Sequence, residues 1–133
     1  MRCLIVDDSE TFRDAARRLL ERDGLAVVGM ASTLAEGLRS ARDLKPDVTL
    51  IDVHLGAESG FDLARRLREE RPSASTAVIL TSADPEQELV QCHADIPTDG
   101  FVPKSTLSGN RIRELAGLDA AQRSAVGEKG DRR

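Results

Sequence analysis

The sequence predicts a doubly wound α/β fold, in which a parallel sheet of five strands carries helices on both faces. Short apolar runs alternate with amphipathic helical segments five times over about 118 residues. The runs are apolar at successive positions, as in strands that are buried on both faces. The 133 residues correspond to one domain, and 40% hydrophobic and 32% charged residues are ordinary for a globular protein.

The first unit begins close to the N-terminus. The apolar run Cys3–Val6 predicts a buried strand, and Asp7 and Asp8 follow it directly. Ser9 is a suitable N-cap for a helix whose apolar residues recur at i, i+3, i+4, i+7 and i+8. These residues are Phe12, Ala15, Ala16, Leu19 and Leu20. Gly24 has the position of a residue that ends this helix.

The second unit has clear boundary signals. Leu25–Met30 predicts the second strand. Thr33 and Glu36 have the spacing of a capping box, which predicts the start of the second helix. Pro46 closes the segment, because proline cannot continue a helix.

The third unit has a single aspartate at the end of its strand. Val48–Ile51 predicts a strand that ends at Asp52, and residues 54–59 predict a loop. A third helix begins near Gly60, and its apolar residues are Phe61, Leu63, Ala64 and Leu67.

The last two units follow the same plan. Ala77–Leu80 and Gly100–Val102 predict the fourth and fifth strands. Asp84, which proline follows, predicts the N-cap of a fourth helix, and Ser108 predicts the N-cap of a fifth helix that Gly117 ends. The predicted domain therefore covers residues 1–118. Residues 119–133 are charged and poor in large apolar side chains, so we expect a flexible tail there.

Composition excludes several classes of function. The 19 Lys and Arg residues against 23 Asp and Glu residues argue against direct binding of nucleic acid, and three aromatic residues are too few for a base-stacking platform. No apolar run approaches the ~18 residues of a membrane span. Cys3 and Cys92 lack metal or redox spacing, which indicates a reducing, cytoplasmic setting.

Polar residues follow four of the five predicted strands. In an open α/β sheet, ligands bind at the carboxyl ends of the strands, where the strand order reverses. In the flavodoxin-like order 2-1-3-4-5, this places Asp7, Asp8 and Asp52 in one pocket, with Thr81 and Lys104 beside them. Three clustered carboxylates repel each other unless a cation intervenes, and an all-oxygen set suits Mg²⁺. A metal, an ammonium and a hydroxyl around a carboxylate are the requirements of phosphoryl transfer to that carboxylate.

With these residues in order, the chain resembles the receiver domain of two-component response regulators over roughly residues 2–117. The residues that carry the resemblance are the acidic pair Asp7 and Asp8 after the first strand, and Asp52 at the end of the third strand. They also include Gly60 at the start of a helix, Thr81 at the end of the fourth strand, and Phe101 three residues before Lys104.

The resemblance implies that Asp52 accepts a phosphoryl group from a phosphohistidine, on a sensor histidine kinase or a phosphotransfer protein. It also implies that Mg²⁺ is held by Asp8, Asp52 and the backbone carbonyl of His54, with Asp7 bound through water. The chain would then be a signalling phosphoacceptor and not an enzyme, limited to phosphorylation and dephosphorylation of itself.

The resemblance further implies a conformational switch. Lys104 would pair with the phosphoryl group, Thr81 would move to form a hydrogen bond with it, and Phe101 would turn into the space that Thr81 leaves. This would change the surface of the fourth helix, fifth strand and fifth helix, which would bind a downstream protein or form a homodimer.

Three positions depart from the usual family pattern. Gly56 stands where proline is common after Asp52, and Pro103 before Lys104 is also unusual. Ser105 follows Lys104 where the family usually has a proline with a cis bond. A cis bond before serine would cost ~3–4 kcal/mol, so we expect either a trans bond or a strained one.

Two other functions remain open. The chain could be the receiver part of a DNA-binding transcription regulator whose output domain is missing, with a linker beginning near residues 117–119. It could also be a phosphatase with an aspartyl-phosphate intermediate. Such enzymes carry Asp-x-Asp and a cap region, whereas Asp7 and Asp8 are adjacent.

Overall fold

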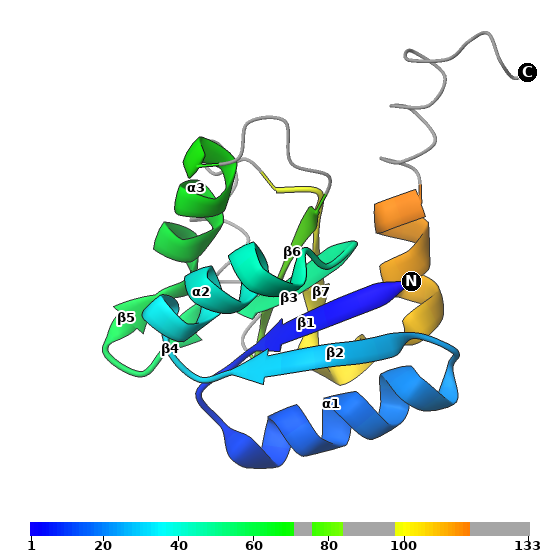
Figure 1. Ribbon diagram of the computed structural model, residues 1–133. Helices are drawn as coiled ribbons and strands as arrows, with labels where there is room; N and C mark the ends of the chain where they lie inside the picture. Colours follow the sequence, from blue (N-terminus) through cyan, green and yellow to red (C-terminus); the bar gives the residue numbers. More distant parts are fainter. Residues whose placement is uncertain (71–75, 84–97, 118–133) are drawn as a thin grey trace, which may run out of the picture.

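The computed structural model describes residues 1–70, 76–83 and 98–117. A five-stranded parallel sheet forms its centre (Figure 1), with strands β1 (Arg2–Val6), β2 (Ala26–Ala31), β3 (Val48–Asp52), β6 (Ala77–Ser82) and β7 (Gly100–Pro103). The strand order is β2-β1-β3-β6-β7, with every neighbouring pair parallel. This is the predicted order 2-1-3-4-5, because β4 and β5 belong to a separate hairpin, and the predicted fold class is confirmed.

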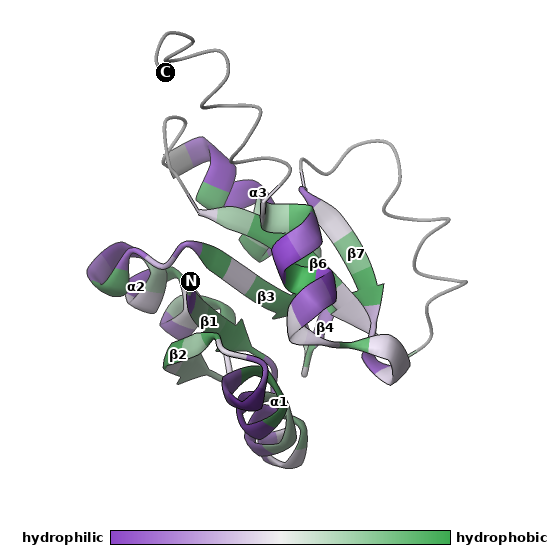
Figure 2. Ribbon diagram, turned by 90° about the vertical axis from the view of Figure 1, so that its right-hand side faces the viewer, coloured by the Kyte–Doolittle hydropathy of each residue, from purple (hydrophilic) through white to green (hydrophobic). Residues whose placement is uncertain are grey.

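Helices cover both faces of the sheet. Helix α1 (Glu10–Arg22) and a helical segment at residues 109–117 pack on one face, while α2 (Leu34–Leu44) and α3 (Gly60–Glu70) pack on the other. A short 3-10 helix, η1 (Lys104–Thr106), follows β7. Figure 2 shows largely apolar strands between helices that carry hydrophilic residues, as expected for a sheet that is buried on both sides.

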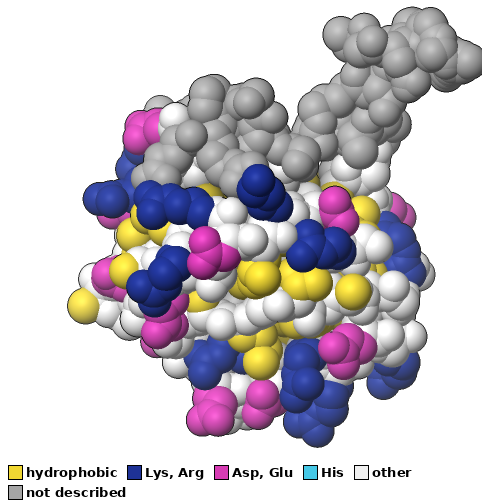
Figure 3. Space-filling view, in the orientation of Figure 1, with side chains coloured by type: hydrophobic (Ala, Val, Ile, Leu, Met, Phe, Trp, Pro, Cys, Tyr) yellow, Lys and Arg dark blue, Asp and Glu magenta, His cyan; other side chains and the backbone are white. Residues whose placement is uncertain are grey.

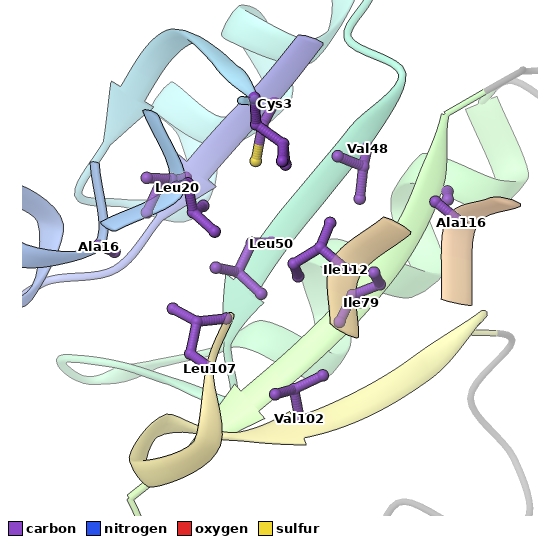
Figure 4. Packing of buried hydrophobic residues seen from close by; sticks show 13 residues of the cluster. Cys3, Ala16, Leu20, Val48, Leu50, Ile79, Val102, Leu107, Ile112 and Ala116 are labelled. Atoms are coloured by element: carbon purple, nitrogen blue, oxygen red, sulfur yellow. The ribbon is translucent and has the colours of Figure 1, made fainter. Parts of the chain in front are cut away.

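Alternation along the strands divides the core into two layers. Cys3 and Ile5 of β1 belong to the cluster beneath α1 and residues 109–117, whereas Leu4 and Val6 belong to the cluster beneath α2 and α3. All four side chains have no exposed surface. Figure 4 shows the first cluster, in which residues of β1, β3, β6 and β7 lie against residues of the covering helices. Because both strand faces are buried, the runs are continuously apolar in the sequence.

The ends of α1 match the boundary signals. Ser9 is the N-cap, and its hydroxyl accepts a hydrogen bond from the backbone N–H of Phe12 at 3.2 Å. Gly24 has a φ of 97°, a left-handed conformation that glycine adopts without steric cost. Ala16 and Leu20 are buried as predicted, but Ala15 is exposed. The apolar stripe is therefore narrower than the sequence pattern suggested.

Helix α2 begins with a modified capping box. The hydroxyl of Thr33 accepts from the backbone N–H of Glu36 at 3.1 Å, as predicted. The carboxylate of Glu36 accepts from the backbone N–H of Ser32 at 2.9 Å, and not from that of Thr33. At the other end, Lys45 is left-handed with a φ of 49°, and Pro46 follows it.

The segment predicted as a loop after β3 forms a small antiparallel hairpin. Its strands are β4 (His54–Leu55) and β5 (Glu58–Ser59), and Gly56 in the turn has a φ of 62°. The carboxylate of Glu58 accepts from the backbone N–H of Leu34, at 3.0 Å. The hairpin is therefore tied to the start of α2.

Some sequence predictions concern residues outside the described ranges. The fourth helix at Asp84, Cys92 and the tail at residues 119–133 lie there. Gly117, the predicted end of the last helix, is helical and is the last residue that the structure describes. Ser108 caps that helix as predicted, since its hydroxyl accepts from the backbone N–H of Arg111 at 3.0 Å. Within the described ranges, none of the helices has the length and apolar character needed to cross a membrane.

The surface carries charges of both signs. On the face shown in Figure 3, Lys and Arg side chains are interspersed with Asp and Glu side chains around a band of hydrophobic residues. Met1 and Met30 are the large hydrophobic residues that are exposed among those described. This face does not present the single-sign basic patch typical of a nucleic-acid interface.

Candidate functional site

The strand register brings the predicted pocket residues to one edge of the sheet. Val6 of β1 pairs with Ile51 of β3. Asp7, which follows β1, therefore lies beside Asp52, the last residue of β3. Asp52 pairs in turn with Thr81 of β6. Three adjacent strands therefore end with polar side chains at the same level, which is where ligands bind in such sheets.

Three carboxylates meet in this pocket. One oxygen each of Asp7, Asp8 and Asp52 lies within 4.8 Å of the others. Asp7 has no exposed surface and Asp52 is 5% exposed, whereas Asp8 is exposed. The pocket thus has two buried acids and one acid open to solvent.

Lys104 places its ammonium against both buried acids. Its Nζ atom lies 2.9 Å from Asp7 Oδ2 and 3.4 Å from Asp52 Oδ2. The lysine is the first residue of η1, and the bond between Lys104 and Ser105 is trans. Burial by itself lowers the pKa of Lys104, but its hydrogen bond to Asp7 and the charges of Asp52 and Asp7 outweigh this and raise that pKa. The ammonium is therefore retained.

The electrostatics of the pocket distinguish Asp52. Burial, followed by the nearby charge of Asp7, raises the pKa of Asp52 to about 6, although Lys104 and the backbone N–H of His54 oppose the shift. The N–H of His54 donates to Asp52 Oδ1 at 3.3 Å. A carboxylate with a raised pKa is more basic and is still ionised at neutral pH, as a nucleophile must be.

The start of α1 holds the first acid and the lysine. Asp7 Oδ1 accepts from the backbone N–H of Ser9 at 2.8 Å, and the guanidinium of Arg13 donates to the backbone carbonyl of Asp7 at 2.7 Å. The ring centroid of Phe12 lies 4.3 Å from Lys104 Nζ. Phe12 and Arg13 are site residues that the sequence pattern does not indicate, because the helical spacing only predicts that Phe12 faces the core.

The two proposed switch residues occupy different environments. Thr81 is fully buried, and within the part of the chain that the structure describes its Oγ1 has no hydrogen-bond partner. A buried hydroxyl without a partner is costly, which favours a second position in which this hydroxyl is bonded. Phe101 is half-buried and packs against the cluster beneath α2 and α3, and it pairs with Leu80 next to Thr81 in the strand register.

His54 and Gly60 lie close to Asp52, and the backbone of each is the part that concerns the site. The side chain of His54 is exposed, and the role of its carbonyl as a metal ligand stays a prediction. The backbone N–H of Gly60 donates to the carbonyl of Val53 at 2.8 Å. A Cβ atom on Gly60 would lie 2.0 Å from the carbonyl oxygen of Asp52, so only glycine fits this approach.

The donor set of the pocket fits a hard cation. Carboxylate oxygens of Asp7, Asp8 and Asp52 are within reach of one ion. Oxygen donors are what Mg²⁺ prefers, and the exposure of Asp8 leaves room for the waters that this ion keeps. The acidic pocket is therefore able to bind a metal by its chemistry.

Comparison with known proteins identifies the family. A sequence model of the response regulator receiver domain matches residues 3–116. The chain belongs to this family. Response regulator GacA from Pseudomonas viridiflava is 40% identical to this receiver domain over 126 residues, which cover 92% of the chain and 57% of GacA. The transcriptional regulatory protein CseB from Streptomyces coelicolor is 38% identical over 101 residues, which cover 76% of the chain and 42% of CseB.

The receiver domain spans about half the length of these curated relatives. Among solved structures, the signal receiver domain of NarL from Mycobacterium tuberculosis has a TM-score of 0.77 and 28% identity, covering 87% of this chain and 95% of that one. Response regulator PhyR from Brucella abortus has a TM-score of 0.74 and 26% identity, and covers 94% of this chain and 51% of that one.

Proposed function

We propose that the receiver domain accepts a phosphoryl group on Asp52 from a phosphohistidine of a sensor histidine kinase or a phosphotransfer protein. One observation carries the proposal: a buried carboxylate with a raised pKa lies among two other acids and an ammonium. A carboxylate oxygen of Asp52 forms the new P–O bond while the P–N bond of the donor breaks, and the donor histidine keeps the bonding electron pair. The product is an aspartyl phosphate.

Each neighbour of Asp52 has a part in the proposed reaction. The ammonium of Lys104, now 3.4 Å from Asp52 Oδ2, neutralises charge on the incoming phosphoryl oxygens. The acids of the pocket hold Mg²⁺, which when bound supplies positive charge to the same oxygens. The buried hydroxyl of Thr81 gains a hydrogen-bond partner in the phosphoryl group.

The proposed output is a change at the surface near β7. Movement of Thr81 toward the phosphoryl group leaves space that Phe101 enters. Phe101 pairs with Leu80, the residue before Thr81, in the register of β6 and β7. The surface formed by β7, the last helix and the fourth helix predicted from the sequence then binds a downstream protein or a second copy. In this proposal the chain is a cytoplasmic signalling phosphoacceptor that acts catalytically only on itself.

Mass spectrometry tests the acceptor directly. Incubation with Mg²⁺ and a small phosphodonor such as phosphoramidate is expected to add one phosphoryl mass to the full chain. Asp52→Asn is expected to abolish the addition, and the control Asp62→Asn, which changes an exposed acid paired with Arg65, is expected to retain it. An unchanged mass of the unmodified chain, or equal labelling of Asp52→Asn, would contradict the proposal.

A transcription regulator is the second candidate. It is favoured by one comparison: CseB, a transcriptional regulatory protein, is more than twice as long as the segment that matches it. In that case the chain is the receiver part of a longer regulator, and a further domain contacts DNA. Retention of the chain itself on DNA at physiological salt would support direct binding, whereas the acid excess of 23 against 19 basic residues predicts no retention.

A further inference from the structure

The aromatic ring of Phe12 lies beside the ammonium of the pocket lysine. The distance from Lys104 Nζ to the ring centroid is 4.3 Å, inside the range of a cation–π interaction. Phe12 lies in the first turn of α1, where the backbone N–H that it donates to Ser9 fixes its position. It also packs against the core cluster beneath α1. The ring is thus held by the fold independently of the lysine.

Among the described residues, the charged partners of the ammonium are groups that change during the proposed reaction. They are Asp7, at 2.9 Å, and Asp52, at 3.4 Å. Asp52 becomes esterified by the phosphoryl group, and Asp7 is one of the acids assigned to the metal. Both carboxylates would then bind the ammonium less strongly. The ring of Phe12 carries no charge and is not a metal ligand, so its attraction to the ammonium does not depend on either event.

We propose that Phe12 is a positioning residue, whose ring face holds the ammonium of Lys104 at the phosphoryl-accepting edge of the pocket when the carboxylates change partners. This inference rests on the proposed function. It adds a determinant on α1 to a site otherwise built from the strand ends. The ring acts through Lys104 and does not touch the reacting atoms.

A series of fluorinated phenylalanines at position 12 tests the electrostatic part of this role. One, two and three fluorine atoms progressively weaken the negative ring face and nearly preserve its shape. The rate of labelling by phosphoramidate with Mg²⁺ is expected to fall stepwise, by about two- to tenfold in total, at an unchanged melting temperature. The same series at Phe61, which packs against the other core cluster, is the matched control and is expected to leave the rate unchanged.

Two further variants separate positioning from packing. Phe12→Leu is expected to reduce the labelling rate to a similar extent, and Phe12→Trp is expected to restore it, since tryptophan offers a stronger ring face. In NMR spectra, the ε-methylene protons of Lys104 are expected to be shifted upfield by the ring, and Phe12→Leu is expected to remove that shift without any phosphodonor present.

The outcomes distinguish the two proposals. A labelling rate that does not vary with fluorination, in a chain whose Asp52→Asn variant is not labelled, would overturn the role of Phe12 and leave Asp52 as the acceptor. A failure of Phe12→Trp to restore the rate would also count against the ring. A wild-type chain that is not labelled at all would overturn the proposed function and this inference with it.

Discussion

Asp52 carries an electrostatic cost in the metal-free protein. Its surface is 5% exposed, and burial together with the charge of Asp7 raises its pKa to about 6 from an ordinary value near 4. The folded state therefore binds more protons than the unfolded state between these two values. The contribution of Asp52 to the free energy of unfolding therefore falls as the pH rises through that window, and its full destabilising effect is present at pH 7.

The buried charge predicts that a neutral residue at position 52 stabilises the metal-free protein. Asp52→Asn is expected to raise the free energy of unfolding of the metal-free protein by about 1–3 kcal/mol at pH 7, because the amide carries no charge to bury. The gain is expected to shrink as the pH falls below 6 and to disappear near pH 3, below both pKa values, where the wild-type carboxyl is protonated in both states. Chemical denaturation at a series of pH values in EDTA measures this.

Metal addition provides the control for that variant. If the penalty arises from clustered acids, Mg²⁺ is expected to stabilise the wild-type chain and to have a smaller effect on Asp52→Asn. Equal unfolding free energies of the two proteins at pH 7 and pH 3 would show that Asp52 is not destabilising.

At the scale of elements, α1 serves the pocket through its first turn. Ser9 caps the helix through its hydroxyl and also donates its backbone N–H to Asp7 at 2.8 Å. In α2, Thr33 makes the equivalent cap to Glu36, but it forms no hydrogen bond with the described pocket residues. The two helices therefore offer one cap beside the site and one away from it.

Removing each cap separates stability from function. Ser9→Ala and Thr33→Ala are each expected to lower the free energy of unfolding by about 1 kcal/mol, since each leaves a helix N–H without its partner. Ser9→Ala alone is expected to slow labelling of Asp52, because the first turn of α1 also carries Phe12 and Arg13 against the pocket. Denaturation and labelling rates measure the two effects, and equal slowing by Thr33→Ala would refute a specific role of α1.

The elements show why some of the site was predictable. Asp7 and Asp52 directly follow runs of buried residues, so their place at the strand ends is a local property of the sequence. The β4–β5 hairpin was not predicted, because strands of two residues are too short to show an alternating pattern. The helical spacing predicts that Phe12 faces the core, and its place beside Lys104 follows only from how α1 packs on the face of the sheet.

At the scale of the whole molecule, α1 and the last helix are joined by Asp23, a contact that no local pattern indicates. The carboxylate of Asp23 accepts from the backbone N–H of Gly109 at 2.7 Å, and its carbonyl accepts from the guanidinium of Arg113. A Cβ atom on Gly109 would lie 2.4 Å from that of Asp23, so glycine permits the approach. The end of α1 thus caps a helix that is distant in sequence but covers the same face of the sheet.

Loss of this link is expected to loosen the last helix before the rest of the fold. Asp23→Ala removes the carboxylate that accepts from Gly109, while the Ser108 cap of the helical segment 109–117 remains. It is expected to lower the free energy of unfolding by about 1–2 kcal/mol. Amide exchange at Ile112, a buried residue of that segment, is expected to accelerate more than exchange in β1. The control Asp43→Ala changes an exposed acid on α2 and is expected to leave both unchanged. If exchange at Ile112 stayed at the wild-type rate in Asp23→Ala, the carboxylate of Asp23 would not be what holds the last helix against α1.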